Sequence, residues 1–344
     1  MLGLVKYGHG IGMVELREVE VPKAEPGEVL IEVKAASICG SDIHIYRDEH
    51  PYWPPMVLGH EFSGQIAEVG EGVDGWAVGD RVVSETRTAT CGVCRQCQTG
   101  YPQLCRNKRP PGIGRNGAFA KFVAMPAALL HRLPEKVSFD AGAVCEPLAI
   151  CTTALIETAG IRAGERVVVI GPGPIGQLSM QVALAAGASK VIVCGRAKTD
   201  AIRLAKAEEL GATRTVKVDE ESVEEAVMGE TEGEGADLVV ECSGAVPAIT
   251  QSFGLARRQG RIAAIGISGR NDVPVPWDDA IFKAQQLFFC FSSSWRAWGT
   301  ALALLEAGRL NVEAIITHRI KLQEWEDAFR DIEEGRAIKV IIHP

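Results

Sequence analysis

The sequence predicts an α/β protein with two domains, one of mostly antiparallel β structure and one built on a doubly wound parallel sheet. Three observations support this fold class. The chain has 344 residues, which is long enough for two hydrophobic cores. Short β-like runs between Gly and Asp turn signals fill its first part, and strand-like and helix-like runs alternate after Gly164. We place the second domain at residues 151–288 and the first at 1–150 together with 289–344.

Composition and charge exclude several classes of protein. Hydrophobic residues make up 47% of the chain and charged residues 23%, as in ordinary globular proteins. A net charge of −8 argues against nucleic acid or an anionic membrane as a partner. Residues 167–189 are uncharged over the length of a membrane span, but Gly171, Pro172, Gly173 and Pro174 break the run into strand, turn and helix. The first residues show no secretory signal peptide, and we expect a cytoplasmic protein.

The first domain contains a candidate catalytic metal site. Strands are expected at 29–35, 64–69 and 81–84, and Cys39 lies after the first of them, with His60 and Glu61 before the second. A thiolate, an imidazole and a carboxylate on loops at strand ends are zinc-ligand types, and an open fourth position would make the site catalytic. Each residue alone is as readily a buried thiol or a satisfied polar group.

Four cysteines further along form a more specific metal signal. They lie within fifteen residues, at Cys91, Cys94, Cys97 and Cys105. Four thiolates at this spacing can surround one zinc ion tetrahedrally and leave no open position, which predicts a structural site. Two disulfides or an iron–sulfur cluster are the competing interpretations, and an intracellular setting disfavours the disulfides.

The second domain opens on helix-like sequence at 139–158 and then alternates. The alternating strands and helices are expected at 167–170, 175–186, 191–194, 200–210, 237–242 and 261–265. Gly171, Gly173 and Gly176 give the G-x-G-x-x-G spacing directly after the first of these strands. The first glycine permits the tight turn, the second lets the backbone approach a pyrophosphate, and the third lets the helix press on the strand. Alone the motif is also compatible with a generic β–α turn.

The residue after the second strand of this domain predicts which dinucleotide binds. An acidic residue there holds the ribose 2′-hydroxyl of NAD, whereas an arginine accommodates the 2′-phosphate of NADP. Gly195 stands at the acidic position, and Arg196 and Lys198 supply positive charge. We therefore predict a preference for NADP. The alternative is that both cations are solvated and Asp200 binds the ribose of NAD.

The C-terminal part is expected to add a strand at 287–291, a polar loop at 292–298, two amphipathic helices and a final strand at 340–342. An apolar edge strand needs cover, which predicts a homo-oligomer. The loop, through Ser293 and Trp295, is a candidate wall of the substrate pocket together with Trp53, although packing aromatics in a surface turn explain it equally.

The order of these motifs resembles the zinc-dependent medium-chain dehydrogenase family over essentially the whole chain. The stretch from Cys39 to Tyr46, Cys-Gly-Ser-Asp-Ile-His-Ile-Tyr, is similar to its threonine and polyol dehydrogenase branches, and Glu146-Pro147-Leu148 is similar to the polyol branch. The resemblance implies a GroES-like catalytic domain, a Rossmann cofactor domain, two zinc ions per chain and a homotetramer or homodimer.

The resemblance also implies roles for individual residues. Cys39 and His60 would bind the catalytic zinc, Glu61 would be a ligand or an exchanging carboxylate, and Glu146 would bind directly or through water. Asp42 would orient His60, while Ser41 and His44 would carry the alcohol proton to solvent. A shift of one residue would present Cys145 in place of Glu146. Residues implied to bind the cofactor are Gly171, Gly173, Pro174, Ile175, Gly176, Gly195, Arg196 and Lys198, with Ser243 and Gly266 on the nicotinamide side.

The expected activity is the reversible oxidation of a secondary alcohol to a ketone, with hydride transfer to NADP or NAD. The substrate would be a small polyol, sugar alcohol or hydroxy amino acid. The alternatives are a threonine 3-dehydrogenase activity, a zinc-free quinone reductase, and a non-catalytic NADPH-binding sensor or structural protein.

Overall fold

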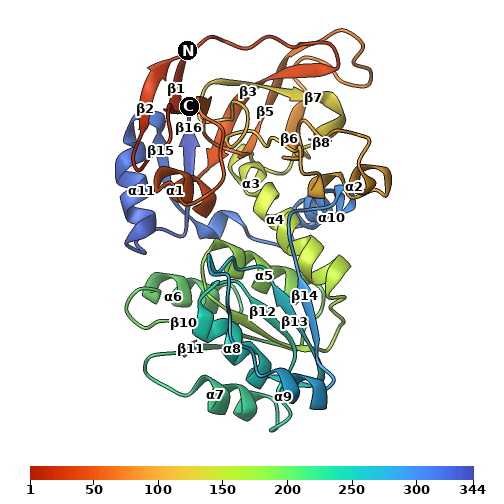
Figure 1. Ribbon diagram of the computed structural model, residues 1–344, viewed down its shortest axis with the longest axis vertical. Helices are drawn as coiled ribbons and strands as arrows, with labels where there is room; N and C mark the ends of the chain where they lie inside the picture. Colours follow the sequence, from red (N-terminus) through yellow and green to blue (C-terminus); the bar gives the residue numbers. More distant parts are fainter. The chain divides into compact units, whose positions relative to one another are not determined.

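The alternating runs of the first 140 residues form antiparallel strands in the computed structural model, which describes residues 1–344 (Figure 1). The chain divides into two units, each discontinuous in sequence. The first consists of Met1–Glu146, Ser293–Glu306 and Ile316–Pro344, and the second of Pro147–Ser292 and Ala307–Ile315. Our sequence-based boundaries at 150/151 and 288/289 lie four residues away from these divisions, and they do not separate out the segment Ala307–Ile315.

Two sheets form the first unit. A small antiparallel sheet has the order β2-β1-β4, with β1 at Leu2–Lys6, β2 at Val14–Glu18 and β4 at Met56–Val57. The larger sheet has the order β15-β16-β3-β5-β6-β8, and β7 also pairs with β3. Its strands are β3 (Glu28–Ser37), β5 (Glu61–Val69), β6 (Arg81–Ser84), β7 (Phe122–Pro126), β8 (Leu130–Arg132), β15 (Ile316–Lys321) and β16 (Lys339–His343). Only β15 and β16 pair in parallel, so the prediction of a mostly antiparallel domain is confirmed.

The end of the chain returns to the strand that precedes Cys39. Strand β16 pairs antiparallel with β3, with Ile341 opposite Ser37 and Ile342 opposite Ala36. Helix α11 (Trp325–Glu333) packs the edges of Trp325 and Phe329 against each other and against Tyr46, with ring centroids 5.2–6.0 Å apart. Such edge-to-face contacts stabilise more than the buried area alone. They fix the C-terminal strand beside helix α1 (Gly40–Tyr46).

The remaining helices of the first unit are short. They are α2 (Arg95–Gln98), α3 (Phe139–Ala143) and α10 (Trp295–Glu306). Ser138 caps α3 by accepting a hydrogen bond from the Ala141 backbone N–H at 3.0 Å. Helix α4 (Cys145–Thr152) crosses the division between the units and continues as a π-helical turn at Thr153–Thr158. The helical stretch that we predicted at 139–158 is therefore α3, followed after Val144 by α4 and its π-helical continuation.

A six-stranded parallel sheet forms the centre of the second unit, in the order β11-β10-β9-β12-β13-β14. Its strands are β9 (Arg166–Ile170), β10 (Lys190–Gly195), β11 (Arg214–Lys217), β12 (Ala236–Glu241), β13 (Ala256–Ala264) and β14 (Gln286–Phe289). The helices are α5 (Pro174–Ala185), α6 (Ala201–Glu209), α7 (Val223–Glu230), α8 (Val246–Leu255) and α9 (Trp277–Phe282) (Figure 1). This is the predicted doubly wound sheet, and the Rossmann fold class is confirmed.

The strand order reverses between β9 and β12. Ligands of doubly wound sheets bind at such a switch point, beyond the carboxyl ends of the strands. Gly171 follows β9 and Ser243 lies just beyond β12, so both lie at this edge. None of the helices combines the length and the hydropathy that a bilayer crossing requires. The cytoplasmic location stays a prediction.

Candidate metal centres and dinucleotide site

The fold brings Cys39, His60 and Glu61 together. Cys39 precedes α1, and its backbone N–H donates to the Asp42 carboxylate at 2.9 Å, which fixes the start of the helix. His60 and Glu61 stand at the beginning of β5, beside the end of β3. One ligand atom from each of the three residues lies within 4.8 Å of the others. The predicted trio therefore forms a compact set with the donor types of a zinc site.

The charges around His60 favour a bound cation. Burial works to lower the pKa of His60, but the charges of Asp42 and Cys39 outweigh it and raise that pKa well above its usual value. His60 Nδ1, Asp42 Oδ1 and Glu61 Oε1 are buried without a hydrogen-bond partner. Unpaired buried polar atoms are costly, and a divalent ion beside the trio would satisfy Glu61 Oε1, whereas His60 Nδ1 and Asp42 Oδ1 face each other at 3.6 Å. The residues present thus fit a zinc ion.

Glu61 has a second, cationic neighbour that sequence analysis missed. The buried ammonium of Lys339 donates to Glu61 Oε2 and, at 3.0 Å, to the Ile38 carbonyl, and Ser37 Oγ donates to the same Glu61 oxygen. One carboxylate oxygen is therefore engaged and the other, Oε1, is free to face a metal. A single lysine in the apolar strand Lys339-Val-Ile-Ile was the available signal, because a buried lysine needs an anionic partner.

Glu146, rather than Cys145, faces this set. Burial raises the pKa of Glu146 to about 7, while the positive charge of His60 opposes that rise. Cys145 is fully buried, burial raises its pKa, and its only electrostatic neighbour is Glu146. The compact trio does not include Glu146, and its role as a direct or water-mediated ligand stays a prediction.

Asp42 lies beside His60, as predicted, and Ser41 also contacts His60, whereas His44 does not. Ser41 Oγ lies 3.3 Å from His60 Nε2, and Asp42 Oδ1 lies 3.6 Å from His60 Nδ1. His44 is exposed at the end of α1, where its Nδ1 lies 2.9 Å from the Glu49 carboxylate. His44 is thus in position to exchange a proton with solvent.

The four cysteines converge on one point. Their sulfur atoms all lie within 4.8 Å of one another, with Cys94 to Cys97 at 3.5 Å and Cys91 to Cys105 at 3.6 Å. All four are free thiols, so the disulfide interpretation finds no support in the structure. The Cys91 backbone N–H donates to Cys105 Sγ and lowers the pKa of that thiol to about 6. Thiolates held by N–H donors are the ligand state that zinc requires.

The glycine motif has the geometry that its spacing predicts. Gly171 has φ +96°, and a Cβ there would lie 3.0 Å from Ser243. A Cβ on Gly176 would lie 1.9 Å from the Gly171 carbonyl oxygen, so helix α5 packs directly against the turn. A Cβ on Gly173 would meet nothing within 4 Å. The fold itself therefore does not require glycine at 173, which is consistent with a ligand approaching the backbone there. Pro174 and Ile175 open α5.

The end of β10 carries no acidic side chain. A Cβ on Gly195 would lie 2.6 Å from Pro172, so packing excludes an acid at this position. Arg196 and Lys198 are exposed. The Asp200 carboxylate accepts hydrogen bonds from the Arg196 backbone N–H and from the Arg203 side chain, at 2.9 and 3.0 Å. Asp200 is thereby held within its own loop, which weakens the alternative in which it binds a ribose.

A buried carboxylate organises the turn after β12. Glu241 accepts from the backbone N–H groups of Ser243 and Gly244, at 2.8 and 3.1 Å, and from the Ser243 hydroxyl. A Cβ on Gly266 would come within 2.5 Å of the Glu241 carboxylate. Ser243 and Gly266 therefore lie at adjacent strand ends beside Gly171. Glu241 is a second residue whose role sequence analysis did not assign.

The three residues proposed for the substrate pocket differ in their surroundings. Trp53 is 45% exposed, and the Arg109 guanidinium lies over its ring at 4.0 Å from the centroid. Trp295 is 53% exposed and packs on His131, with ring centroids 4.0 Å apart. Ser293 is buried, and its hydroxyl oxygen accepts a hydrogen bond from Trp298 Nε1 at 3.0 Å. The exposed indoles can contact a ligand, whereas the Ser293 hydroxyl is engaged internally.

Two protein families match this chain. Residues 25–135 match the alcohol dehydrogenase GroES-like domain, and residues 174–307 match the zinc-binding dehydrogenase family. Both matched segments include residues of the sites described above: Cys39, His60 and the four cysteines in the first, and Gly176, Arg196 and Ser243 in the second.

Relatives that match over the whole chain are named as polyol, polyol-phosphate or threonine dehydrogenases. The chain is 41% identical to a sorbitol dehydrogenase of Halalkalibacterium halodurans, covering 100% of this chain and 99% of the relative. It is 37% identical to a D-arabitol-phosphate dehydrogenase of Enterococcus avium (99% and 97%) and 36% identical to an L-threonine 3-dehydrogenase of Pyrococcus horikoshii (99% and 98%). Among solved structures, a zinc-binding dehydrogenase of Sinorhizobium meliloti bound to NADP matches with a TM-score of 0.93 at 34% identity, over 100% of this chain and 99% of that one.

Proposed function

This chain belongs to the zinc-dependent medium-chain dehydrogenase family, in its polyol and threonine dehydrogenase branch, and on that premise we propose that it reversibly oxidises a secondary alcohol of a small polyol to a ketone with NADP. The observation that carries this proposal is the convergence of Cys39, His60 and Glu61, with Glu146 beside them, in a buried and anionic setting.

Cys39 and His60 would hold the catalytic zinc, with Glu61 or Glu146 completing the protein ligands, and Cys91, Cys94, Cys97 and Cys105 would hold a structural zinc. A zinc ion acts as a Lewis acid that lowers the pKa of an alcohol. Asp42 holds the His60 ring from its Nδ1 side. Lys339 holds one oxygen of Glu61 and leaves the other free to approach or leave the metal.

The alcohol must lose a hydride and a proton. NADP bound at the turn after β9 would supply the hydride acceptor. Ser41 lies 3.3 Å from His60 and takes the proton first, and His44 on the next turn of α1 passes it to solvent. Ile43 and Ile45 of the same helix are buried and anchor α1. The Ser41 hydroxyl and the His44 imidazole therefore keep their orientation.

The experiment measures polyol-dependent NADPH formation together with metal content. We expect about two zinc ions per chain in the native protein, and we expect Cys39→Ser to lose the catalytic zinc and turnover while the four-cysteine zinc remains. Cys290→Ser, outside both clusters, is the control. One zinc per chain with full activity would contradict the two-site proposal.

NADP preference is the finer part of the proposal. It is supported by the exposed cations at 196 and 198, by the engaged Asp200, and by a structural relative that was solved with NADP. We expect Arg196→Ala to lower kcat/KM for NADP about tenfold or more and to leave kcat/KM for NAD nearly unchanged, since hydrogen bonds to charged groups contribute about 1.5–3 kcal/mol. Equal losses with both dinucleotides would count against it.

Threonine 3-dehydrogenase activity is the second candidate, because relatives in this range of identity carry that name. A screen of threonine against sorbitol, arabitol and 2,3-butanediol separates the two. A zinc-free quinone reductase would retain activity after chelation, and a non-catalytic NADPH-binding protein would oxidise none of these alcohols.

We further propose that the second unit pairs with another copy through β14. This edge strand exposes Leu287 and Phe289, and the adjacent α9 exposes Ile281 and Phe282. The opposite edge, β11, has the sequence Arg-Thr-Val-Lys and is protected by charge. Pairing of two β14 strands about a two-fold axis would bury the apolar edge, which supports a homodimer or a dimer-based tetramer.

A further inference from the structure

The charge of this protein is unevenly distributed. The chain as a whole has a net charge of −8, but residues 86–134 contain no Asp or Glu. The same segment contains eight cationic residues, namely Arg87, Arg95, Arg106, Lys108, Arg109, Arg115, Lys121 and Arg132. This segment includes the four-cysteine lobe and the loop that follows it. The four thiolates proposed to bind zinc lie in the same segment, so the cations that could bind a ligand are those that neither a thiolate nor a carboxylate neutralises.

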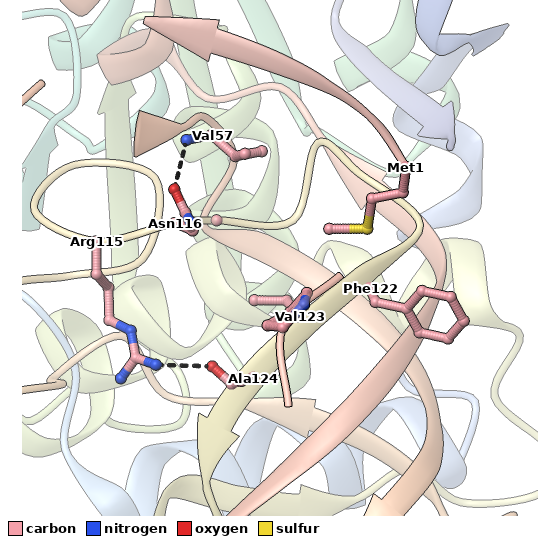
Figure 2. A pocket seen from close by; sticks show the side chains of 9 residues that line it. Met1, Val57, Arg115, Asn116, Phe122, Val123 and Ala124 are labelled. Atoms are coloured by element: carbon pink, nitrogen blue, oxygen red, sulfur yellow. Dashed lines mark hydrogen bonds between the residues drawn. The ribbon is translucent and has the colours of Figure 1, made fainter. Parts of the chain in front are cut away.

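Three of these cations are neutralised by the fold. Arg87 pairs with Glu85, Arg132 pairs with Asp80, and Arg115 pairs with Glu28 at 3.2 Å. Figure 2 shows Arg115 at the wall of a cavity of about 250 Å³, where it also donates to the Ala124 carbonyl while Asn116 accepts from the Val57 backbone. The polar groups drawn in that cavity form hydrogen bonds with one another, so this cavity offers no unpaired cation to an anionic ligand.

Arg109 differs because no carboxylate pairs with it. Its guanidinium donates only to the carbonyls of Asn107 and Lys108 and lies over the half-exposed ring of Trp53. Its backbone N–H donates to the Thr88 carbonyl at 3.0 Å, and the Thr88 hydroxyl donates back to the Arg109 carbonyl. A Cβ on Gly114 would lie 2.6 Å from Arg109 Cδ, so the following loop closes against the side chain. The guanidinium is therefore held in one place before any ligand arrives.

The loop that carries Arg109 is attached to the metal site. The Trp53 backbone N–H donates to the Ile113 carbonyl at 2.9 Å, and the Ala118 N–H donates to the Gly59 carbonyl at 2.9 Å. Gly59 directly precedes the proposed ligand His60, and a Cβ on Gly112 would lie 2.6 Å from the Gly59 backbone. The Arg109 loop is thus bonded to the segment between Trp53 and His60 at both of its ends.

A second cation approaches the same site from the four-cysteine lobe. The Lys108 ammonium is half-buried and donates to the Gln103 carbonyl at 2.8 Å. Burial lowers the pKa of Lys108, and the Glu146 carboxylate counteracts this effect. Lys108 and Arg109 are consecutive, so one short segment carries both charges.

We propose that Arg109, with Lys108 beside it, binds an oxyanion on the alcohol substrate, and that this substrate is a polyol phosphate. The inference rests on the dehydrogenase function proposed above and names its substrate class. A guanidinium fork matches a phosphate bidentately, and a neighbouring lysine supplies a second positive charge for the dianion. The Trp53 face backs the guanidinium and can also contact carbon. Threonine fits this setting less well, because two cations would repel its ammonium group.

The test compares kcat/KM for sorbitol 6-phosphate and D-arabitol 5-phosphate with that for sorbitol and D-arabitol, using the zinc-loaded full-length enzyme and saturating NADP. We expect the phosphorylated substrates to be favoured about 100-fold or more. Arg109→Gln should lower kcat/KM for the phosphates about 10- to 100-fold, mainly through KM, and lower kcat/KM for the parent polyols much less. Arg109→Lys should retain part of the preference, and Lys121→Gln, which removes one charge elsewhere in the segment, should retain all of it.

Other outcomes overturn the inference. Equal kcat/KM for phosphorylated and parent polyols, or an equal loss of kcat/KM for both in Arg109→Gln, would show that Arg109 does not bind a phosphate. A preference for threonine or a hydroxy acid would show that the oxyanion is a carboxylate. Calorimetric binding of sorbitol 6-phosphate to the enzyme–NADP complex gives a readout without turnover. If no alcohol is oxidised but sorbitol 6-phosphate binds and Arg109→Gln weakens its binding, the proposed reaction fails and the anion site stands. If it does not bind, the anion site fails independently.

Discussion

Lys339 illustrates how a single charge depends on its partner in this fold. Its ammonium and the Glu61 carboxylate are both almost completely buried, and the ammonium donates to this carboxylate and to the Ile38 carbonyl. Removing one partner of a buried pair leaves the other charge uncompensated, so we expect Lys339→Met to lower the free energy of unfolding by about 3–5 kcal/mol.

Urea denaturation of the zinc-loaded protein measures this effect. The matched control is Lys34→Met, which breaks the half-exposed pair with Glu32, and its expected cost is below about 1 kcal/mol. Similar losses in the two variants would show that burial of the Glu61 pair does not determine its contribution.

Asp237 predicts a dependence of stability on pH. Burial works to raise its pKa, but the Arg166 backbone N–H and the Arg257 side chain outweigh burial and lower that pKa below its usual value. A carboxylate whose pKa is lower in the folded state stabilises the fold above the unfolded pKa, and this contribution is lost as the pH falls through the folded value. We expect Asp237→Asn to cost about 1.5–3 kcal/mol at pH 7 and progressively less below about pH 4.

The measurement is the urea midpoint of wild type and variant at pH 7, 5 and 3. Asp272→Asn, in an exposed loop, serves as the control and should cost little at any of these values. A difference for Asp237→Asn that stays constant down to pH 3 would mean that its ionisation is not the cause.

The turn between β9 and α5 separates two roles of glycine within one element. Gly176 is required by the fold, because a Cβ there would lie 1.9 Å from the Gly171 carbonyl oxygen, whereas a Cβ on Gly173 meets nothing. We expect Gly176→Ala to destabilise the protein by about 3 kcal/mol or more. Gly173→Ala should cost less than about 1 kcal/mol and still weaken NADP binding about tenfold or more, because its methyl would occupy the path of the pyrophosphate.

Thermal denaturation without cofactor, paired with NADPH titration by fluorescence, distinguishes the two effects. Gly176→Ala and Gly173→Ala therefore serve as controls for each other. Normal NADPH affinity in Gly173→Ala would contradict the position that we give to the pyrophosphate.

At the scale of the whole molecule, the second unit carries an apolar edge that we propose is covered by a second copy of this chain. Phe289 on β14 is 82% exposed, and Phe282 on α9 is 75% exposed. We expect Phe289→Glu to convert a homodimer or tetramer into a smaller species in sedimentation experiments, because two carboxylates would face each other across a two-fold axis. Val218→Glu, placed beside the opposite edge strand β11, should leave the mass unchanged. An unchanged mass in Phe289→Glu would exclude this edge as the interface.

The sequence alone established the features that depend on residues near one another in the chain. The four cysteines lie within fifteen residues, and the glycine motif lies within six, so spacing already limits their geometry. The alternation after Gly164 indicates the parallel sheet because a β-α-β unit is also local. The fold class, the family and the dehydrogenase activity are confirmed on this basis. The helical stretch predicted at 139–158 begins and ends at the residues where the structure has helix, but it is not one helix, because α3 ends at Ala143 and the last six residues are π-helical.

Only the tertiary structure decided which distant charges meet. Lys339 is 278 residues away from Glu61, yet β16 pairs with β3 and brings the two together. Arg109 and Trp53 come from separate loops. They stack because backbone hydrogen bonds join the loop after Arg109 to the segment between Trp53 and His60. No local pattern predicts such pairs, since the free energy of burying a charge depends on a partner that the chain supplies from elsewhere. The sequence thus determined which ligand types the catalytic metal site contains, and the fold determined which charged side chains surround it.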